Sequence, residues 1–237
     1  MSPLESCLHE LVIANRILAH EGVVDGFGHV SIRHPERPDR FFLSCSRSPQ
    51  LVTLDDLMEF DLDCRPIDQR GRIMYNERPI HGGLYRARTD VAAVVHNHAY
   101  ELIPFSVTDV RLRPLLHLAG PIGSDIPVWD IGAKFGETDM LVRNLDHAAD
   151  LAACLGRNSV ALMRGHGAAV VGGSLREAVY RAVYLMVNAR MQMQAMQFAR
   201  PIRFLTPDEI EKTSAMVATP VSLDRAWENW VQRSGGA

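Results

Sequence analysis

Residues 91–98 read VAAVVHNH, and this stretch decides what kind of fold the chain can adopt. The apolar run 91–95, rich in valine, is typical of a buried strand. Side chains two apart on a strand point to the same face, so His96 and His98 can converge on one ion while Asn97 faces away. Two imidazoles suit Zn, Mn, Fe or Ni. A His-x-His pair alone also fits a structural or surface pair, so the rest of the chain must decide.

On either side of this strand, strands and helices are interspersed without a regular βαβ repeat. That order argues against a Rossmann or TIM design and favours an α/β sandwich with a mixed or antiparallel sheet. Apolar periodicity and turn residues predict further strands at 28–33, 40–44, 58–62, 159–163 and 168–171, and helices at 4–18, 78–88, 138–155 and 174–198. The segment 113–136 is rich in Pro and Gly and predicts loops between short strands.

Helix-start signals mark the second half of the chain. Ser174 and Glu177 predict a capping box that opens the long helix. Thr206, Pro207 and Glu209 predict a second helix start, with proline at its first position. We therefore expect one domain over 1–237, with C-terminal helices from about residue 206.

Composition limits the classes of function. The 237 residues are 47% hydrophobic, enough for one sizeable core. The formal charge of -3, without a Lys/Arg cluster, argues against a nucleic-acid partner. No secretory signal is evident, and no apolar run reaches the roughly 20 residues that a membrane helix needs. The four cysteines form no C-x-x-C pair, and a cytoplasmic protein with no membrane partner is the expectation.

Two further residues are candidates for the same site as the histidine pair. His166 lies between Gly165 and Gly167, at a tight turn between two apolar strands, although a purely structural turn is equally compatible. Glu77 precedes a predicted helix, and that helix with its return strand would bring Glu77 near His96. A carboxylate there could ligate a metal or act as a general acid or base, unless it only complements the helix dipole. Three histidine ligands with an open position describe a catalytic site, whose ion acts as a Lewis acid.

The ordered set of these motifs resembles the class II aldolase/adducin family, which includes fuculose-phosphate aldolase and ribulose-phosphate epimerase. The set comprises Gly28-x-Val30-Ser31, Glu77, His81 and Tyr85, His96-x-His98, Gly165-His166-Gly167 and the long helix from Ser174. The resemblance implies a three-layer α/β/α sandwich with a central, largely antiparallel sheet. It also implies that His96, His98 and His166 bind a divalent metal ion, Zn²⁺ or Mn²⁺, and that Glu77 is the catalytic acid/base. Members are commonly homotetramers with sites at subunit interfaces, and the same is expected here.

The chain departs from the sugar-phosphate members of this family at the phosphate pocket. Gly28-His29 stands where they usually have Gly-Asn, residues 44–47 (Ser-Cys-Ser-Arg) replace a Thr-Pro-Ser-Gly-like loop, and Tyr75-Asn76 replaces Ser-Ser. A phosphate cradle depends on exposed backbone amides, which an arginine in the loop would crowd. Arg47 and His29 could instead hold a planar carboxylate. The substrate-binding residues predicted from these positions are His29, Ser44, Ser46, Arg47 and Asn76.

A decarboxylase branch of the family is similar in these respects. It includes proteins like 3-hydroxy-2-methylpyridine-4,5-dicarboxylate decarboxylase and decarboxylases of carboxylated ring-cleavage products. Residues 135–138, 163–167 and 188–192 resemble that branch. The resemblance implies a metal-dependent carbon–carbon lyase that decarboxylates a hydroxylated aromatic (di)carboxylate or a ring-cleavage product. The alternatives are a sugar-phosphate aldolase or epimerase, disfavoured by the altered phosphate loop, and a non-catalytic adducin-like interaction domain, disfavoured by the three histidines and Glu77.

Overall fold

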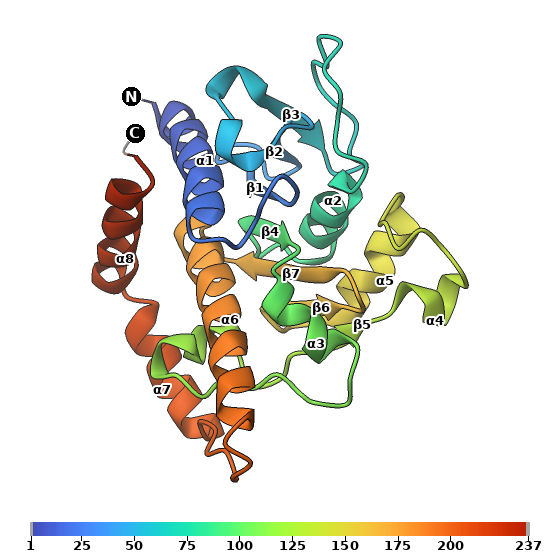
Figure 1. The fold of residues 1–237 in the computed structure, drawn as a ribbon. Coiled ribbons are helices and arrows are strands. Elements are labelled where there is room, and N and C mark those ends of the chain that lie inside the picture. Colours follow the sequence, from blue (N-terminus) through green and yellow to red (C-terminus); the bar gives the residue numbers. More distant parts are fainter. Residues whose placement is uncertain (1, 236–237) are drawn as a thin grey trace.

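The strand that contains His96 lies in the middle of a seven-stranded sheet of order β3-β2-β1-β4-β7-β6-β5 (Figure 1). The structure is a computed structural model and describes residues 2–235. The strands are β1 His29–Arg33, β2 Arg40–Ser44, β3 Leu57–Asp61, β4 Ala93–Asn97, β5 Val128–Trp129, β6 Val160–Met163 and β7 Gly167–Gly172. Neighbouring strands run antiparallel except β5 and β6, which are parallel. The expected largely antiparallel sheet is therefore confirmed.

Helices cover both faces of the sheet. The α-helices are α1 Pro3–His20, α2 Arg78–Ala87, α3 Ile103–Ser106, α4 Ile131–Phe135, α5 Leu145–Leu155, α6 Leu175–Met196, α7 Pro207–Val217 and α8 Pro220–Arg233. Short 3₁₀ turns occupy Pro49–Leu51, Leu54–Asp56, Tyr100–Leu102 and His117–Ile122. Figure 1 shows α1 and α6 on one face of the sheet and α2 and α5 on the other, which confirms the three-layer arrangement.

The alternation along β4 explains why Ala93, Val94 and Val95 are apolar without interruption. Ala93 and Val95 belong to the core shared with α1 and α6, whereas Val94 belongs to the core shared with α2 and α5. A strand whose two faces are both covered favours apolar residues at successive positions. Each fully buried valine stabilises the fold by about 1.5–3 kcal/mol, so β4 is a rigid support for the histidines at its end.

The predicted helix starts are present with one difference. Thr206 and Glu209 form a full capping box at α7, and Ser174 Oγ accepts the N–H of Glu177 at α6. The predicted box at Ser174 is incomplete, because Glu177 Oε2 accepts instead from the N–H of Gly173 at 2.6 Å. A cap of this kind stabilises a helix by about 1 kcal/mol.

Element boundaries differ most in the predicted helix over 138–155. That helix begins only at Leu145, because Asn144 is its N-cap and accepts the N–H of His147. Residues 138–144 form a loop that contacts the site described below. The segment 113–136 contains, beyond loops, the 3₁₀ turn His117–Ile122, strand β5 and helix α4.

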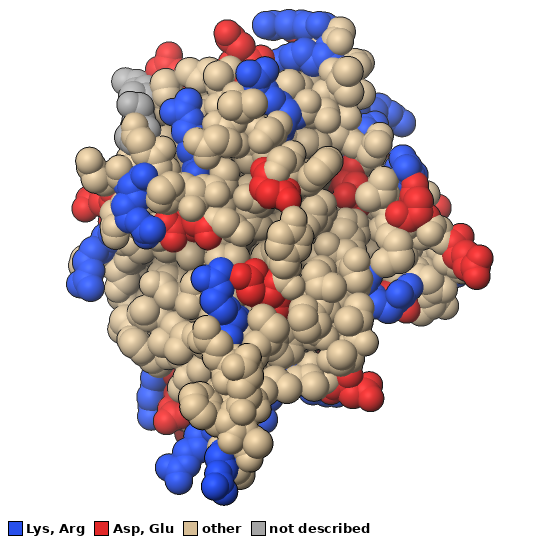
Figure 2. Space-filling model, viewed as in Figure 1, with Lys and Arg blue, Asp and Glu red and all other residues tan. Residues whose placement is uncertain are grey.

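The surface carries charges of both signs. On the face drawn in Figure 2, Lys and Arg side chains lie interspersed with Asp and Glu, so the field across this face is mixed. Among the described residues, no helix combines the length and the apolar character that crossing a membrane requires.

Candidate metal centre

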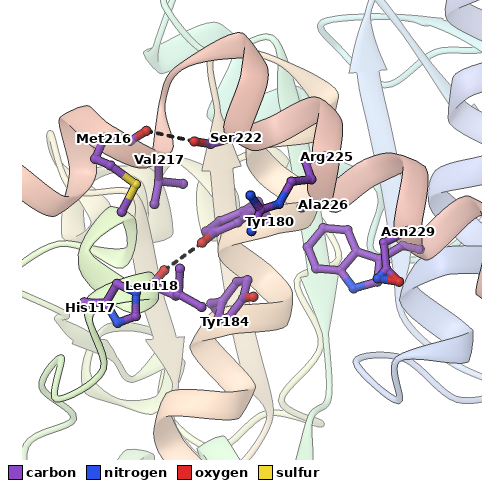
Figure 3. A pocket seen from close by; sticks show the side chains of 11 residues that line it. His117, Leu118, Tyr180, Tyr184, Met216, Val217, Ser222, Arg225, Ala226 and Asn229 are labelled. Carbon is purple, nitrogen blue, oxygen red and sulfur yellow. Dashed lines mark hydrogen bonds between the residues drawn. The ribbon is translucent and has the colours of Figure 1, made fainter.

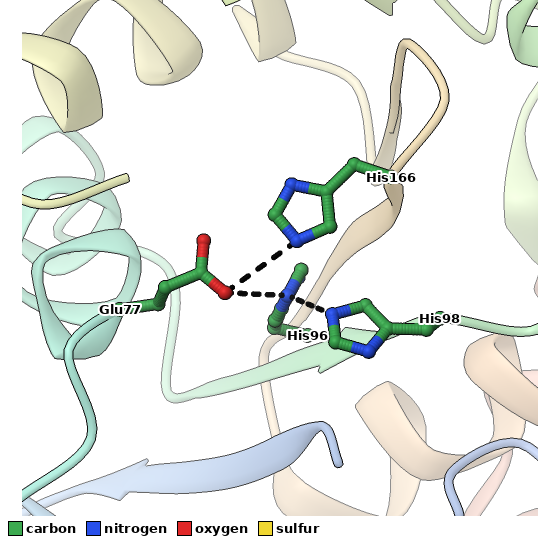
Figure 4. A group of neighbouring side chains, drawn as sticks. All are labelled: Glu77, His96, His98 and His166. Atoms are coloured by element: carbon green, nitrogen blue, oxygen red, sulfur yellow. Dashed lines mark hydrogen bonds and ion pairs between the residues drawn. The ribbon is translucent and has the colours of Figure 1, made fainter. Parts of the chain in front are cut away.

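Glu77, His96, His98 and His166 meet at one end of the central strands (Figure 4). One potential ligand atom from each residue lies within 4.8 Å of all the others. The Nε2 atoms of His96 and His98 are 3.0 Å apart. Glu77 Oε2 lies 3.5 Å from His96 Nε2 and 3.4 Å from His166 Nε2. The structure thus brings together the three predicted metal ligands and the predicted acid/base.

Strand pairing places the three histidines. His96 is on β4, and His98 follows directly after it on the same face, as the period of two predicts. β4 pairs with β7 so that Asn97 is opposite Ala168. The residue just before β7, His166, therefore lies beside the end of β4 although it is far from His98 along the chain.

Glycines on both sides of His166 make its turn possible. Gly165 has a φ of +61°, in the left-handed region that disfavours other residues. The His166 N–H donates to Met163 O at 3.0 Å and closes the turn between β6 and β7. A Cβ on Gly167 would overlap the carbonyl oxygen of Asn97. The two glycines therefore let the turn approach β4 closely enough for His166 to join the other histidines.

Glu77 is the N-cap residue of α2 and is 7% exposed. Its Oε1 accepts the N–H of Val142 at 2.9 Å, which leaves Oε2 facing the histidines. Burial raises the pKa of Glu77, but the close contacts of its carboxylate with His166 and His96 outweigh burial and hold that pKa well below its usual range. The carboxylate is therefore ionised and available to a cation or a proton.

The state of the imidazoles fits a divalent cation. His96 Nδ1 donates to Ala168 O at 3.1 Å, so the lone pair of this ring is on Nε2, which faces the other ligands. Burial and the neighbouring His96 and His166 lower the pKa of His98 to about 4, so this ring is neutral at pH 7. Metal–nitrogen bonds of about 2.0–2.1 Å separate neighbouring ligand atoms by roughly 3.0–3.4 Å, close to the distances found here.

A cavity of about 450 Å³ opens onto this centre, with Glu77 and His98 in its wall. Of the predicted substrate-binding residues, His29, Ser46, Arg47 and Asn76 line it. Ser44 does not: it is 1% exposed and its hydroxyl lies 3.4 Å from the Tyr75 hydroxyl. Ser44 therefore supports Tyr75 from behind the cavity wall.

Arg47 is partly held by its own loop. Its Nε donates to Leu51 O at 2.8 Å and lies 3.4 Å from Asp56 Oδ2. The guanidinium remains about half exposed, with a side-chain exposure of 46%. These contacts fix the direction of the arginine at the cavity while leaving its terminal nitrogens open to a ligand.

Three of the larger residues that line this cavity were not among the predicted site residues. Tyr75 packs its ring against His29 at 4.6 Å and donates its hydroxyl proton to Arg47 O. Phe27, 70% exposed, and Leu141 also line the cavity. An aromatic residue two positions before the candidate acid/base was the available signal for Tyr75, whereas Leu141 lies in the loop mistaken for helix.

A second cavity, of about 430 Å³, lies between α6 and the C-terminal helices (Figure 3). The rings of Tyr180 and Tyr184 pack against each other in its wall in a tilted arrangement with centroids 4.5 Å apart, and Tyr180 donates its hydroxyl proton to Leu118 O at 3.1 Å. The described residues that line it include one histidine, His117, and no carboxylate. This cavity therefore offers no set of metal ligands.

Comparisons with known proteins agree with this geometry. The family model "Class II Aldolase and Adducin N-terminal domain" matches residues 9–193, more than half of the chain. Decarboxylase tropJ of Talaromyces stipitatus is 37% identical over 91% of this chain and 89% of the relative. A 3,4-dihydroxyphthalate decarboxylase of Arthrobacter keyseri is 28% identical over 96% of this chain and 93% of that protein. A solved aldolase II superfamily protein from Pseudomonas syringae has the same fold, with a TM-score of 0.80 at 23% identity over 99% of this chain and 94% of the other.

Proposed function

Because the chain belongs to the class II aldolase and adducin family, we propose that it is a metal-dependent decarboxylase of a hydroxylated aromatic carboxylate or a carboxylated ring-cleavage product. One observation carries the proposal: the Glu77 and histidine centre opens onto a cavity whose wall presents His29 and Arg47. The names of two relatives, a decarboxylase and a 3,4-dihydroxyphthalate decarboxylase, support the same reaction class.

His96, His98 and His166 would hold the ion, with Zn²⁺ and Mn²⁺ both compatible with imidazole ligands. When bound, a divalent ion supplies Lewis-acid stabilisation of negative charge on a substrate oxygen, worth several kcal/mol. The His96 ligand is oriented before an ion binds, because the hydrogen bond from its Nδ1 to Ala168 O fixes both the ring and its tautomer.

Glu77 would carry the proton of the reaction. Glu77, or a water that it holds, would accept the proton of the substrate hydroxyl and deliver it to the ring carbon that bears the carboxylate, which gives the keto form of the ring. The bond to the carboxylate carbon then breaks, CO₂ leaves, and the electron pair of that bond restores the ring and leaves its negative charge on the oxygen. The new C–H bond holds the proton that came from the hydroxyl. The Val142 N–H holds Oε1, so Oε2 is the atom that faces the substrate.

We assign substrate recognition to the residues that line the cavity outside the metal centre. Arg47 would pair with a carboxylate of the substrate, and His29 would donate a second hydrogen bond to it. Ser46 and Asn76, both exposed in the cavity, offer neutral hydrogen-bonding groups. Tyr75 and Phe27 supply aromatic surface, which suits a planar ring better than a sugar phosphate.

The deciding experiment compares two substrate classes on one preparation. Metal-free protein is reloaded with Zn²⁺ or Mn²⁺, and CO₂ release is measured from 3,4-dihydroxyphthalate and related hydroxylated aromatic carboxylates. Aldehyde release from L-fuculose 1-phosphate is measured in parallel. Metal-dependent CO₂ release supports the proposal. Cleavage of the sugar phosphate without CO₂ release would establish the aldolase alternative, and the absence of both activities in metal-loaded protein would favour a non-catalytic domain.

The assembly is proposed to be a homotetramer with sites at subunit interfaces. Two exposed aromatic residues support this: Phe27, which lines the cavity, is 70% exposed, and Tyr100, whose hydroxyl donates to Asp25, is 72% exposed. Large exposed apolar groups grouped at one place often mark protein contacts. Light scattering on the purified protein tests it, and a monomer that is fully active would contradict it.

A further inference from the structure

A buried chain of hydrogen bonds leads from the cavity wall into the layer between β1 and α2. His29 Nδ1 lies 2.6 Å from His81 Nε2, and His81 Nδ1 lies 2.6 Å from Ser31 Oγ. Ser31 Oγ in turn lies 2.7 Å from the Tyr85 hydroxyl. His29 is 4% exposed, and the other three are at most 1% exposed. Water does not compete for these groups, so their protons are distributed within the chain itself.

Two periodicities build this chain. His29 and Ser31 are two apart on β1 and share a face of the sheet, while His81 and Tyr85 are four apart and share a face of α2. Glu77 lies one helical turn before His81 on the same side. The chain is therefore continuous with the candidate metal centre, because His29 is the register partner of His96 and their rings lie 5.0 Å apart.

The direction of the hydrogen bonds follows from counting protons, starting at Tyr85. Among the described residues, Ser31 Oγ is the acceptor for the Tyr85 hydroxyl. Burial raises the pKa of Tyr85, so the phenol keeps its proton and donates it to Ser31. Ser31 has one proton of its own, which then goes to His81 Nδ1.

The remaining links are determined by the same count. His81 accepts at Nδ1, so as a neutral ring it carries its proton on Nε2 and donates it to His29 Nδ1. Two nitrogens 2.6 Å apart have room for one hydrogen between them. His29 therefore carries its own proton on Nε2. The reverse direction would leave the buried Tyr85 proton without its acceptor, which costs about 1–3 kcal/mol.

We propose that Tyr85, Ser31 and His81 are positioning residues that hold His29 as the Nε2–H tautomer, so that the cavity presents a neutral N–H donor to a carboxylate or phenolate oxygen of the substrate. Among the described residues, none forms a hydrogen bond with Nε2 of His29. This nitrogen is not fully buried, so it is accessible from the cavity that His29 lines. This inference rests on the proposed function for the identity of the ligand. The tautomer itself does not depend on that function.

A fixed tautomer has a consequence for ligand choice. An Nε2 lone pair would repel a carboxylate, whereas an Nε2–H attracts it and disfavours a cationic or purely donating group. Since each ring carries one proton, the chain adds no charge beside the metal ligands and is inexpensive to bury. The buried hydroxyls of Ser31 and Tyr85 thus select among ligands that they never touch.

The test measures the tautomer and ligand binding separately, on zinc-loaded protein, because Zn²⁺ permits NMR of nearby nuclei. Long-range ¹⁵N–¹H spectra, assigned with the His29→Gln variant, report which nitrogen of His29 and of His81 is protonated. Phthalate, a carboxylate without the hydroxyl needed for reaction, is the binding probe. We expect Nε2 protonation of both rings and a shift of the His29 N–H resonance on adding phthalate.

Variants then break the chain while preserving the fold. Ser31→Ala should shift His29 toward the Nδ1–H tautomer and weaken phthalate binding in proportion to the Nε2–H population lost, about tenfold where one-tenth of it remains. Tyr85→Phe keeps the packing and should have a smaller effect of the same kind. Ser31→Thr keeps the hydroxyl and should restore both readouts, and Ile32→Val on the same strand is the control for general destabilisation.

Two results would overturn the proposal. One is Nδ1 protonation of His29 in the unaltered protein. The other is an unchanged tautomer and phthalate affinity in both Ser31→Ala and Tyr85→Phe. If the tautomer is as expected and phthalate binds but no carboxylate is decarboxylated, the proposed function fails while the positioning role stands.

Discussion

The backbone N–H of Val142 donates a 2.9 Å hydrogen bond to Oε1 of Glu77 and so orients the carboxylate of the candidate acid/base. The bond comes from the irregular segment before α5, in which the neighbouring Leu141 lines the cavity. Because a backbone donor cannot be removed by most side-chain substitutions, the orientation of Glu77 survives changes in residue 77 that keep an acceptor at Oε1. That property makes a clean test of its chemistry possible.

Glu77→Gln should retain the metal and lose turnover. The glutamine oxygen still accepts from Val142, but the amide cannot carry a proton between hydroxyl and carbon. We expect kcat to fall by about 10²–10⁴-fold, the usual contribution of general acid–base catalysis. Metal content is measured by elemental analysis and kcat by CO₂ release, with Glu59→Gln, an ion-paired residue of β3, as control. Unchanged turnover would remove the acid/base role from Glu77.

His96→Ala should abolish metal binding and activity together. His96 is fully buried, and its ring is fixed between Ala168 O and the other ligands, so no neighbouring side chain can replace it. Loss of a residue that only supports a ligand costs roughly 10–100-fold in metal affinity, and loss of a ligand should exceed that. Titration of metal-free protein with Zn²⁺ measures the affinity. His117→Ala, in the second cavity, is the matched control. A variant at His96 with stoichiometric metal and full activity would show that the ligand assignment is wrong.

Arg47→Ala should raise KM for a carboxylated substrate about tenfold or more and change kcat little, since a charge-assisted hydrogen bond is worth about 1.5–3 kcal/mol. The effect is expected at KM because Arg47 lines the cavity but is not one of the residues of the candidate metal centre. Steady-state kinetics measure it, and Arg37→Ala, an exposed arginine near Asp39, is the control. Weakened binding of a sugar phosphate, with carboxylate kinetics unchanged, would point to the aldolase reaction instead.

Much of the metal centre was predictable because it rests on local periodicity. Two histidines separated by one residue must share a face of a strand, and the structure places their Nε2 atoms 3.0 Å apart. A ten-residue helix followed by a strand returns the chain past its own start, which brings Glu77 to His96. Glycines beside His166 signalled a close approach, and the overlap at Gly167 is its physical cause.

The part of the cavity lined by Tyr75 and Leu141 was less predictable. It is built from irregular segments that are distant in sequence and meet only in the folded chain. Tyr75 and Leu141 have no periodic pattern that would point them toward His29 or Glu77. The loop 138–144 reads as helix by apolar spacing, and only Asn144, as an N-cap, signals the later start. Ser44 was expected in the cavity, but its position at the end of β2 turns it inward, behind Tyr75. Local sequence does not encode such directions.

Stability of the metal-free protein should fall as the solution is acidified below pH 6.5. Burial, and to a lesser degree the nearby His96, lowers the pKa of His81 to about 3. Burial also holds the pKa of His29 well below its usual value. In the unfolded chain both rings titrate near 6.5. Between pH 6.5 and about 3 the unfolded state therefore binds more protons than the folded state, and acid favours unfolding. The stabilisation is complete above pH 6.5 and is lost as the pH falls through this window.

His81→Gln isolates the contribution of one ring. A glutamine can accept from Ser31 through its oxygen and donate to His29 through its nitrogen, so it preserves the hydrogen-bond direction while removing the titrating group. The free energy of unfolding, from urea titrations at several pH values between 6.5 and 4, should fall less steeply in His81→Gln than in the unaltered protein. The difference in slope should approach about 1.4 kcal/mol per pH unit, the value for one proton. Equal slopes would mean that His81 is protonated in the folded chain, and a protonated ring could not accept the Ser31 hydroxyl.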